Sequence, residues 1–298
     1  MKYKTLGKSD LKVSEVSYGC MSLGDDHEKN TKLLLAAVEQ GINLFDTADL
    51  YDKGNNEITV GKAFRGIRDR VIISSKVGNQ WRSDGSGWDW NPRKEYILKA
   101  VEDSLKRLQT DYIDLYQLHG GTMEDPIDET IEAFELLQQQ GKIRFYGISS
   151  IRPNVIKEWV KRSNIVSVMM QYSLLDRRPE EECLDVLQQH SISVLARGAY
   201  AKGLLLGKPA TAYLDHSEAE VEKAARAIRS LEDTNRTAAQ IAGRYALHHP
   251  AVASVVLGIR IRSHLHDAIA ISLANPLSTE DLEQLKQIAR PIKYEEHR

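Results

Sequence analysis

The sequence has few cysteines and little excess charge. Cys20 and Cys183 are the two cysteines in 298 residues, and neither lies in a CxxC or metal-type spacing. We therefore expect no disulfide framework and a reducing compartment such as the cytoplasm. The formal net charge of -2 provides no broad basic surface, which argues against nucleic acid or an anionic membrane as a partner.

Long apolar runs are also missing. No stretch approaches the roughly 18 apolar residues of a membrane-spanning helix, and the opening MKYKTLGKSD has no signal-peptide core. The hydrophobic fraction of 42% and the charged fraction of 28% are ordinary for a globular protein. A core of this size needs no metal or disulfide to hold it together.

Short apolar runs recur along the chain and alternate with segments of helical periodicity. Such runs, rich in Val, Ile, Leu and Tyr, are typical of buried parallel strands. They cover residues 15–20, 42–48, 70–77, 112–119, 145–150, 166–172, 192–198 and 253–259, and clear helical segments cover residues 28–41, 92–109, 128–141 and 179–190. Pro92, Pro153 and Pro179 stand where helices are expected to begin.

Eight strands that alternate with helices predict a (β/α)8 TIM barrel, which would fill residues 1–298 as a single domain. A doubly wound sheet is the rival fold, but no GxGxxG turn follows any of the runs. The runs on either side of GKSD (7–10) predict a β-hairpin that caps the base of the barrel. Residues 203–236 predict an extra excursion near the active face, and the chain after Ser278 predicts a final helix.

Polar side chains follow the ends of several predicted strands. Asp46 and Tyr51 follow the second strand, Lys76 ends the third, and His119 ends the fourth. Because the C-terminal ends of barrel strands surround one mouth, where TIM-barrel enzymes carry out their chemistry, we expect these four side chains to converge. The active site is therefore expected at that mouth.

Each of these residues also has an ordinary structural explanation. Asp46 could cap the turn that follows it, and a lone loop tyrosine such as Tyr51 is more often a packing residue than an acid. Lys76 could reach for solvent, and His119 could be a neutral histidine bonded to a backbone carbonyl. All four explanations would have to hold together, which favours a functional interpretation.

The combination suits the protonation of an oxygen that gains negative charge. A tyrosine ordinarily has a pKa near 10, and a neighbouring ammonium favours its charged form. Asp46 would keep Lys76 protonated, and His119 would orient a substrate oxygen. A carbonyl that receives hydride develops such an oxygen. Because no side chain can supply hydride, a nicotinamide cofactor is implied.

Residues 41–63 carry a pattern of small, acidic and aromatic residues that matches a known signature. It comprises Gly41, Asn43, Phe45, Asp46, Thr47, Ala48, Tyr51, Gly54, Glu57, Gly61 and Ala63, and is continued by LKRLQTDYIDLYQLH (105–119) and GKIRFYGISS (141–150). With these segments the chain resembles the aldo-keto reductases, NAD(P)H-dependent carbonyl reductases built on a (β/α)8 barrel. The resemblance implies that Asp46, Tyr51, Lys76 and His119 are catalytic, with Tyr51 as the general acid.

The resemblance also implies an NAD(P)H cofactor, and Arg260 and Arg262 favour NADPH over NADH. No metal is expected. Ser149, Ser150 and Gln171 would hold the nicotinamide carboxamide, Gly203 to Leu205 would pass along the pyrophosphate, and residues 257–270 would bind the adenosine phosphate. The expected cofactor-binding residues are Gly19, Cys20, Met21, Asp46, Ser149, Ser150, Gln171, Arg197, Gly203, Leu204, Leu205, Gly258, Arg260, Arg262 and His264.

Two regions depart from the family pattern. Arg197 stands where many members have a tyrosine that stacks on the nicotinamide; a guanidinium also stacks, and its charge is expected to favour the reduced cofactor. His264 and Ala268 stand where Arg or Gln and Asn are usual. Arg260 and Arg262 remain available for the 2′-phosphate of NADPH, although Arg262 could equally be a solvated charge at a helix start.

Three of the four tryptophans, Trp81, Trp88 and Trp90, lie in one Gly/Ser-rich loop after the third strand. They predict the cover of a pocket with apolar walls, against the alternative of a loop that packs on itself. Tyr172 is a further wall candidate. The expected pocket residues are Met21, Tyr51, Trp81, Trp88 and His119. Such a pocket suits an aldehyde or ketone of modest size, and broad-range reduction of reactive aldehydes.

Two other functions compete with reduction. Lys76 could form a Schiff base in a lyase or aldolase, for which its pKa would have to be lowered. Alternatively, the chain could be a cofactor-sensing partner protein with little turnover. A monomer or a weak homo-oligomer is expected.

Overall fold

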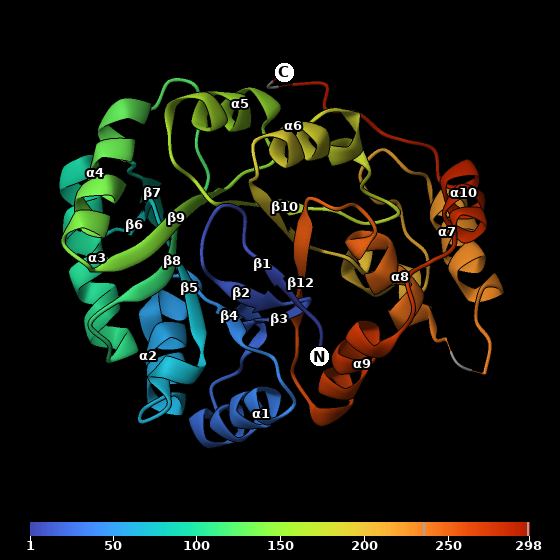
Figure 1. Cartoon of the computed structure of the whole chain (residues 1–298), viewed down its shortest axis with the longest axis horizontal. Helices are drawn as coiled ribbons and strands as arrows, with labels where there is room; N and C mark the ends of the chain where they lie inside the picture. The colour runs from blue at the N-terminus through green and yellow to red at the C-terminus, as the bar shows by residue number, and fades with distance from the viewer. Residues whose placement is uncertain (235, 297) are drawn as a thin grey trace.

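The computed structural model describes residues 1–234, 236–296 and 298. Within them, eight parallel strands close into a barrel in the order β10-β11-β12-β3-β4-β5-β8-β9, so that each strand lies beside its neighbours in sequence. Figure 1 looks onto this ring with the helices arranged outside it. The strands are β3 (Val16–Gly19), β4 (Leu44–Asp46), β5 (Ile72–Val77), β8 (Ile113–Leu118), β9 (Ile143–Ser149), β10 (Ser167–Gln171), β11 (Ser193–Arg197) and β12 (Val252–Gly258). All eight predicted runs form barrel strands, which confirms the predicted fold.

Helices connect the strands and cover the barrel. In the described part of the chain they are α1 (His27–Glu39), α2 (Asn55–Ala63), α3 (Lys94–Leu108), α4 (Ile127–Gln139), α5 (Pro153–Arg162), α6 (Cys183–Gln189), α7 (Glu218–Ser230), α8 (Ala238–Leu247), α9 (Arg262–Leu273) and α10 (Thr279–Ile288). Pro153 begins α5 as predicted, whereas Pro92 lies two residues before α3 and Pro179 lies in a 3-10 turn before α6. None of the helices in the described ranges has the length and apolar character needed to cross a membrane.

Two predicted additions to the barrel are present. Ser278 caps α10 with its hydroxyl and forms a capping box with Asp281, which marks the start of the final helix. The excursion at residues 203–236 contains α7, which packs against α10. It also approaches the mouth, because the Tyr213 hydroxyl lies 3.5 Å from the Gln171 amide nitrogen at the end of β10. Residue 235 of this excursion lies outside the described residues.

The N-terminal hairpin closes the lower end of the barrel. Its strands β1 (Tyr3–Thr5) and β2 (Lys12–Ser14) pair antiparallel, and the turn between them needs Gly7, where a Cβ would lie 2.2 Å from the Val166 carbonyl oxygen. The hairpin contributes three buried side chains to a core inside the barrel. This inner core contains Leu6, Leu11, Val13, Leu44, Ile72, Leu115, Val166, Met169, Leu195, Ala253 and Val256. The predicted cap on the base is confirmed.

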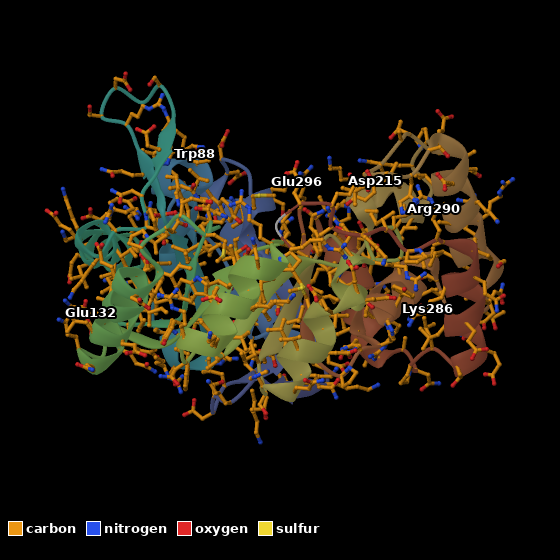
Figure 2. All side chains as sticks on the ribbon, turned by 90° about the horizontal axis from the view of Figure 1, so that it is seen from above. Trp88, Glu132, Asp215, Lys286, Arg290 and Glu296 are labelled. Atoms are coloured by element: carbon orange, nitrogen blue, oxygen red, sulfur yellow. The ribbon has the colours of Figure 1, made fainter. Side chains whose placement is uncertain are left out.

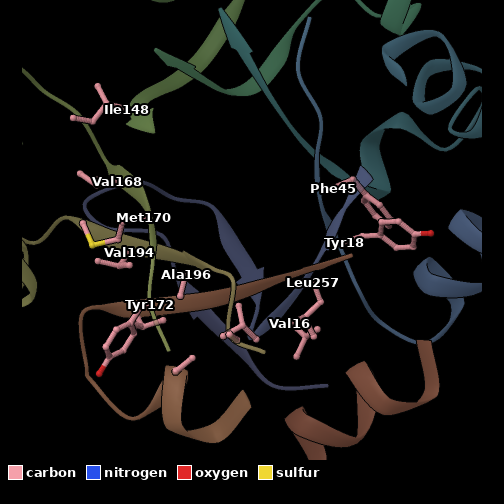
Figure 3. Close-up of a cluster of buried hydrophobic side chains, with 14 of the residues drawn as sticks. Val16, Tyr18, Phe45, Ile148, Val168, Met170, Tyr172, Val194, Ala196 and Leu257 are labelled. Carbon is pink, nitrogen blue, oxygen red and sulfur yellow. The ribbon is translucent and has the colours of Figure 1, made fainter. Parts of the chain in front are cut away.

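A second core lies between the strands and the helices. Successive strand residues point to opposite faces, so Leu44 belongs to the inner core while Phe45 packs outward, and Met169 and Met170 divide in the same way. Figure 3 shows part of this outer core, including Phe45, Met170 and Tyr172. Tyr172 is fully buried there and its hydroxyl donates to Glu180 at 2.9 Å. The prediction that Tyr172 lines the pocket is therefore wrong, because it continues the outward alternation of β10.

Candidate active site

The Lys76 side chain points into the barrel and joins three other groups at the mouth. Its ammonium donates to Asp46 Oδ2 at 2.6 Å, to the Thr47 carbonyl oxygen at 2.7 Å and to the Tyr51 hydroxyl at 3.2 Å. An ammonium has three hydrogens, so all three are in use. Because Tyr51 accepts from Lys76, its own proton is left to point elsewhere.

The Lys76–Asp46 ion pair is almost completely buried, with side-chain exposures of 1% and 5%. Burial alone would favour the neutral amine. The Asp46 carboxylate, together with Tyr51, outweighs that effect and raises the pKa of Lys76 above its ordinary value. Lys76 is therefore held as a cation under the Tyr51 oxygen.

Two residues that sequence analysis missed complete the support of Asp46. Ser74 donates from its hydroxyl to Asp46 Oδ1 at 2.9 Å, and Gln117 donates from its side-chain nitrogen to Ser74 at 2.8 Å. Ser74 precedes Lys76 by two residues, and Gln117 precedes His119 by two. Since residues two apart on a strand share a face, this spacing was the signal that could have identified them.

His119 meets the Tyr51 ring edge-on, with ring centroids 5.8 Å apart and an interplanar angle of 81°. Its Nδ1 atom is buried without a hydrogen-bond partner in the described structure. Burial, followed by the charges of Lys76 and Arg197, lowers the pKa of His119 to about 3. With its pKa this low, the imidazole is neutral near pH 7 and can take part in a hydrogen bond without carrying a charge.

The turn after Tyr51 has an unusual backbone. Asp52 and Lys53 both have positive φ, 48° and 51°, and Gly54 follows at 88°. Left-handed geometry costs roughly 1–2 kcal/mol for each residue with a Cβ, so the surrounding structure must impose it. A Cβ at Gly54 would meet the Arg107 side chain at 2.7 Å. This tight turn takes the chain directly from Tyr51 into α2.

Asn56 ties the same turn to two strand ends. Its carbonyl oxygen accepts from the Thr47 hydroxyl at 2.6 Å, and its amide nitrogen donates to the Cys20 carbonyl oxygen at 2.8 Å. The Cys20 thiol is fully buried, and burial raises its pKa well above the ordinary range. Cys20 therefore supports the mouth through its backbone.

A cavity of about 430 Å³ opens beside Tyr51. Met21, Tyr51, Trp81 and Trp88, four of the five predicted pocket residues, line it, whereas His119 lies outside its lining. Trp81 and Trp88 belong to β6 (Asn79–Trp81) and β7 (Trp88–Trp90), which pair as a hairpin. Figure 2 shows this hairpin, with Trp88 on it, projecting from the barrel.

Trp90, the third tryptophan of the hairpin, packs beneath it. Its indole nitrogen donates to Asp125 at 2.9 Å, and its ring lies against Gly78 and Gly120. A Cβ at Gly78, whose φ is +125°, would approach that ring to 2.7 Å. For Trp90 the structure agrees with the packing alternative, and this residue fixes the hairpin to the barrel.

Gln171 and Arg197 meet on the opposite side of the mouth, at the ends of β10 and β11. Arg197 donates to the Gln171 amide oxygen at 3.0 Å. Ser149 ends β9 beside them, and Ser150 is buried, with its backbone nitrogen bonded to the Met169 carbonyl oxygen. The predicted nicotinamide residues thus come together, although they come from three strands.

Other predicted cofactor residues lie around the same face. Gly19 and Gly258 pair in register between β3 and β12. Leu204 and Leu205 are buried in the 3-10 turn Ala201–Leu206, where Gly203 has a φ of +91°. The two leucine side chains anchor this turn in the core. A ligand would therefore contact the backbone of the turn rather than these side chains.

A second cavity, of about 450 Å³, lies where α1 and α9 begin. Lys29, Lys32, Arg260 and Arg262 contribute positive charge to its lining, and Asp26 and Glu28 contribute negative charge. Ile261, the residue at the N-cap of α9, gives no side-chain hydrogen bond to the helix. Uncapped N–H groups at a helix start favour anions, so the cavity can accept a phosphate.

The remaining residues predicted for the adenosine end lie elsewhere. His264 is exposed on α9 outside the lining of this cavity, and Ala268 is buried in the outer core. In the described ranges, no three His, Cys, Asp or Glu side chains gather as potential ligands for a metal ion.

Comparisons with known proteins agree with this geometry. A family model described as the aldo/keto reductase family matches residues 15–290. The chain is 51% identical to the oxidoreductase YqkF of Bacillus subtilis over the full length of both proteins. Among solved structures, the holo form of aldo-keto reductase AKR11C1 from Bacillus halodurans matches with a TM-score of 0.94 and 50% identity, covering 100% of this chain and 99% of that one. An aldo/keto reductase from Klebsiella pneumoniae in complex with NADP and acetate matches with a TM-score of 0.81 and 29% identity, covering 100% of this chain and 99% of that one.

Proposed function

This chain belongs to the aldo/keto reductase family of oxidoreductases, and on that premise we propose that it reduces aldehydes and ketones with NADPH, using Tyr51 as the general acid. The observation that carries the proposal is the saturation of the Lys76 ammonium by Asp46, Thr47 and Tyr51. It leaves the Tyr51 proton free to face the adjoining cavity, where a carbonyl oxygen would bind.

The proton path needs only this chain's residues. A substrate carbonyl in the cavity would accept a hydrogen bond from the Tyr51 hydroxyl. As negative charge develops on that oxygen, Tyr51 would transfer its proton, and the Lys76 cation would stabilise the charge left on the tyrosine oxygen. Neutral His119, beside the Tyr51 ring, would orient the same carbonyl by a hydrogen bond.

The residues present fit a nicotinamide dinucleotide. The nicotinamide would supply a hydride to the carbonyl carbon. Gln171, Arg197 and Ser149 offer hydrogen-bonding groups for its carboxamide end, and the turn around Gly203 offers backbone for the pyrophosphate. At the other end, the cationic cavity at the start of α9 has the donors that a 2′-phosphate requires.

That cavity is the reason to favour NADPH over NADH. Arg260 and Arg262 both line it, and either guanidinium could bind a phosphate with two parallel hydrogen bonds. Replacing both by alanine should raise the Kd for NADPH by about a hundredfold or more, because charge-assisted hydrogen bonds contribute about 1.5–3 kcal/mol each. The Kd for NADH should stay unchanged. Equal effects on the two cofactors would remove the assignment.

The substrate range follows from the cavity beside Tyr51. Its lining combines apolar residues, among them Met21, Trp81 and Trp88, with the polar residues Tyr51, Asp52, Lys53 and Asn56. Such a mixed lining suits aldehydes of varied shape, including reactive ones. The direct test is an NADPH-oxidation assay over short aldehydes, dicarbonyls, hydroxyalkenals and aryl aldehydes, repeated with NADH and with Tyr51→Phe. Absence of turnover across all four classes in the native protein would overturn the proposal.

A Schiff-base mechanism is disfavoured by the same geometry. Such a lysine must be a free neutral amine, whereas the pKa of Lys76 is raised and its three hydrogens are bonded. Borohydride trapping of a substrate on Lys76 would show otherwise. The cofactor-sensing alternative is tested by replacing the chromosomal copy with Tyr51→Phe, which should abolish cellular function if turnover matters.

A further inference from the structure

We propose that Asp176, Arg178 and Tyr294 form a positioning chain that fixes Gln171, and through it Arg197, for the nicotinamide end of the cofactor. None of the three is expected to touch the cofactor itself. The inference rests on the proposed function, because it assigns a role to contacts behind residues proposed to hold the nicotinamide.

The first link joins Gln171 to Asp176. The Gln171 amide nitrogen donates to Asp176 Oδ2 at 3.3 Å, while its amide oxygen accepts from Arg197 at 3.0 Å. An ionised carboxylate only accepts and a guanidinium only donates. The two neighbours therefore permit one orientation of the Gln171 amide, and that orientation in turn places the Arg197 guanidinium.

The second link holds Asp176 in place. Arg178 donates to both carboxylate oxygens of Asp176, each at 2.8 Å. Asp176 is 1% exposed, and its backbone closes a tight turn with Ser173 directly after β10. A two-pronged Arg–carboxylate contact fixes direction as well as distance, so Asp176 presents Oδ2 to Gln171 in a single geometry.

The third link reaches the C-terminal segment. The Tyr294 ring lies under Arg178, with 4.8 Å from the guanidinium carbon to the ring centroid, and Tyr294 is 6% exposed. The neighbouring Arg177 donates to the carbonyl oxygens of Lys286 and Ala289 at the end of α10. Figure 1 shows the chain after α10 turning back past α6 towards the C-terminus.

These links give the C-terminal segment a function at the mouth. Its tyrosine covers one face of the Arg178–Asp176 pair, which excludes water and strengthens the pairing. Loss of any link would leave the Gln171 amide held only by Arg197 and by the 3.5 Å contact of its nitrogen with the Tyr213 hydroxyl, so Gln171 and Arg197 would both be positioned less firmly. Binding of the nicotinamide half would then weaken, while binding of the adenosine half, on α9, would not change.

This separation between the two halves of the cofactor defines the experiment. Isothermal titration would measure the Kd for NADPH and for adenosine 2′,5′-bisphosphate, which lacks the nicotinamide, on the full-length native protein and on variants. Asp176→Asn keeps the shape of the side chain and removes its charge. Asp185→Asn is the control for the same chemical change away from the mouth, on α6, where the exposed Asp185 carboxylate lies 3.2 Å from His249.

Asp176→Asn should raise the Kd for NADPH by about tenfold, as expected for a weakened charge-assisted hydrogen bond, and leave the Kd for the bisphosphate unchanged. Tyr294→Ala should act in the same direction. Tyr294→Phe should restore native affinity, because the Tyr294 hydroxyl has no hydrogen-bond partner in the described structure and the ring is retained. Asp185→Asn should match the native protein.

Two results would overturn the proposed positioning chain. One is an unchanged Kd for NADPH in folded Asp176→Asn, and the other is an equal rise in the Kd for NADPH and for the bisphosphate. If Asp176→Asn does not fold, Tyr294→Ala and Tyr294→Phe decide, since equal affinities in that pair would also refute it. A native protein that binds the bisphosphate and NADPH but reduces no carbonyl would refute the proposed function while leaving the positioning chain standing.

Discussion

The Tyr51 hydroxyl oxygen accepts a hydrogen bond from the Lys76 ammonium at 3.2 Å. The contact places a buried cation against the atom that would lose a proton during reduction. Since Lys76 is itself held by Asp46 and the Thr47 carbonyl, its ammonium is fixed in place and does not move towards a substrate. Tyr51 is thus the one member of this group that faces the cavity.

Removing the Tyr51 hydroxyl should abolish most of the activity without harming the fold. Tyr51→Phe keeps the ring contact with His119 and lowers kcat by about 10²–10⁴-fold, the range of general acid catalysis. The Kd for NADPH should change little. Steady-state kinetics with titration of the cofactor measures both quantities. Native kcat in this variant would exclude Tyr51 as the acid.

Breaking the buried ion pair should destabilise the protein. Lys76→Met leaves Asp46 buried without its cation, and such losses cost about 3–5 kcal/mol. The double variant Asp46→Leu, Lys76→Met removes both charges and should recover most of that free energy, although it remains inactive. Urea unfolding of both variants checks the difference. A double variant no more stable than Lys76→Met would contradict it.

His119 should make the protein sensitive to acid. Its pKa is about 3 in the folded protein, against an ordinary value near 6.5 in the unfolded chain. Between those values the unfolded chain binds the extra proton, so stability is lost as the pH falls from about 6.5 towards 3. His119→Gln should show a smaller loss of Tm over this interval. Parallel curves for variant and native protein would show that His119 titrates normally.

Asp49 should have the opposite dependence on pH. It is 7% exposed, and one carboxyl oxygen has no hydrogen-bond partner in the part of the chain that is described. Burial, followed by the charge of Glu57, raises its pKa to about 8 despite Arg107. The folded protein then holds the extra proton between about pH 4 and 8, so Asp49 lowers stability as the pH rises through that interval. Asp49→Asn should raise Tm by a few degrees at pH 8 and by less at pH 5; an equal shift at both values would argue against a protonated Asp49.

Gly61 marks a close approach of two helices. A Cβ there would lie 2.5 Å from the backbone carbonyl of Leu108, so α2 would have to move away from α3. Gly61→Ala should cost about 1–3 kcal/mol, as overpacking commonly does. Gly24→Ala is the control, because nothing lies within 4 Å of its added Cβ. Equal midpoints in urea would refute the steric argument.

The fold was accessible from sequence because its signal is local and repeated. Each barrel strand is a short apolar run bounded by polar residues, and parallel strands buried on both faces allow no other pattern. The same regularity placed Asp46, Lys76 and His119 at neighbouring strand ends. Their catalytic roles remain predictions, but their convergence needed only the barrel.

What sequence could not provide are contacts made between loops. The sequence around Gln171 does not indicate that Tyr294, more than a hundred positions later in the chain, packs its ring on Arg178. Trp90 belongs to the same loop as Trp81 and Trp88, and only the Gly78 and Gly120 contacts show that it packs beneath the hairpin. Tyr172 differs from expectation for a simpler reason: the inward and outward alternation of β10 continues past Gln171 and places the Tyr172 side chain in the outer core.

The N-terminal hairpin of β1 and β2 stabilises the end of the barrel opposite the mouth, and this affects which parts of the sequence can change during evolution. Stability at the lower end comes from apolar residues such as Leu6 and Leu11, which belong to the inner core, whereas Trp81 and Trp88 of the tryptophan hairpin line the cavity at the mouth. Substitutions in the tryptophan hairpin can therefore accumulate without destabilising the base of the barrel. A combinatorial library confined to residues 79–90, sparing Trp90, offers a route to new substrate preferences in an intact scaffold.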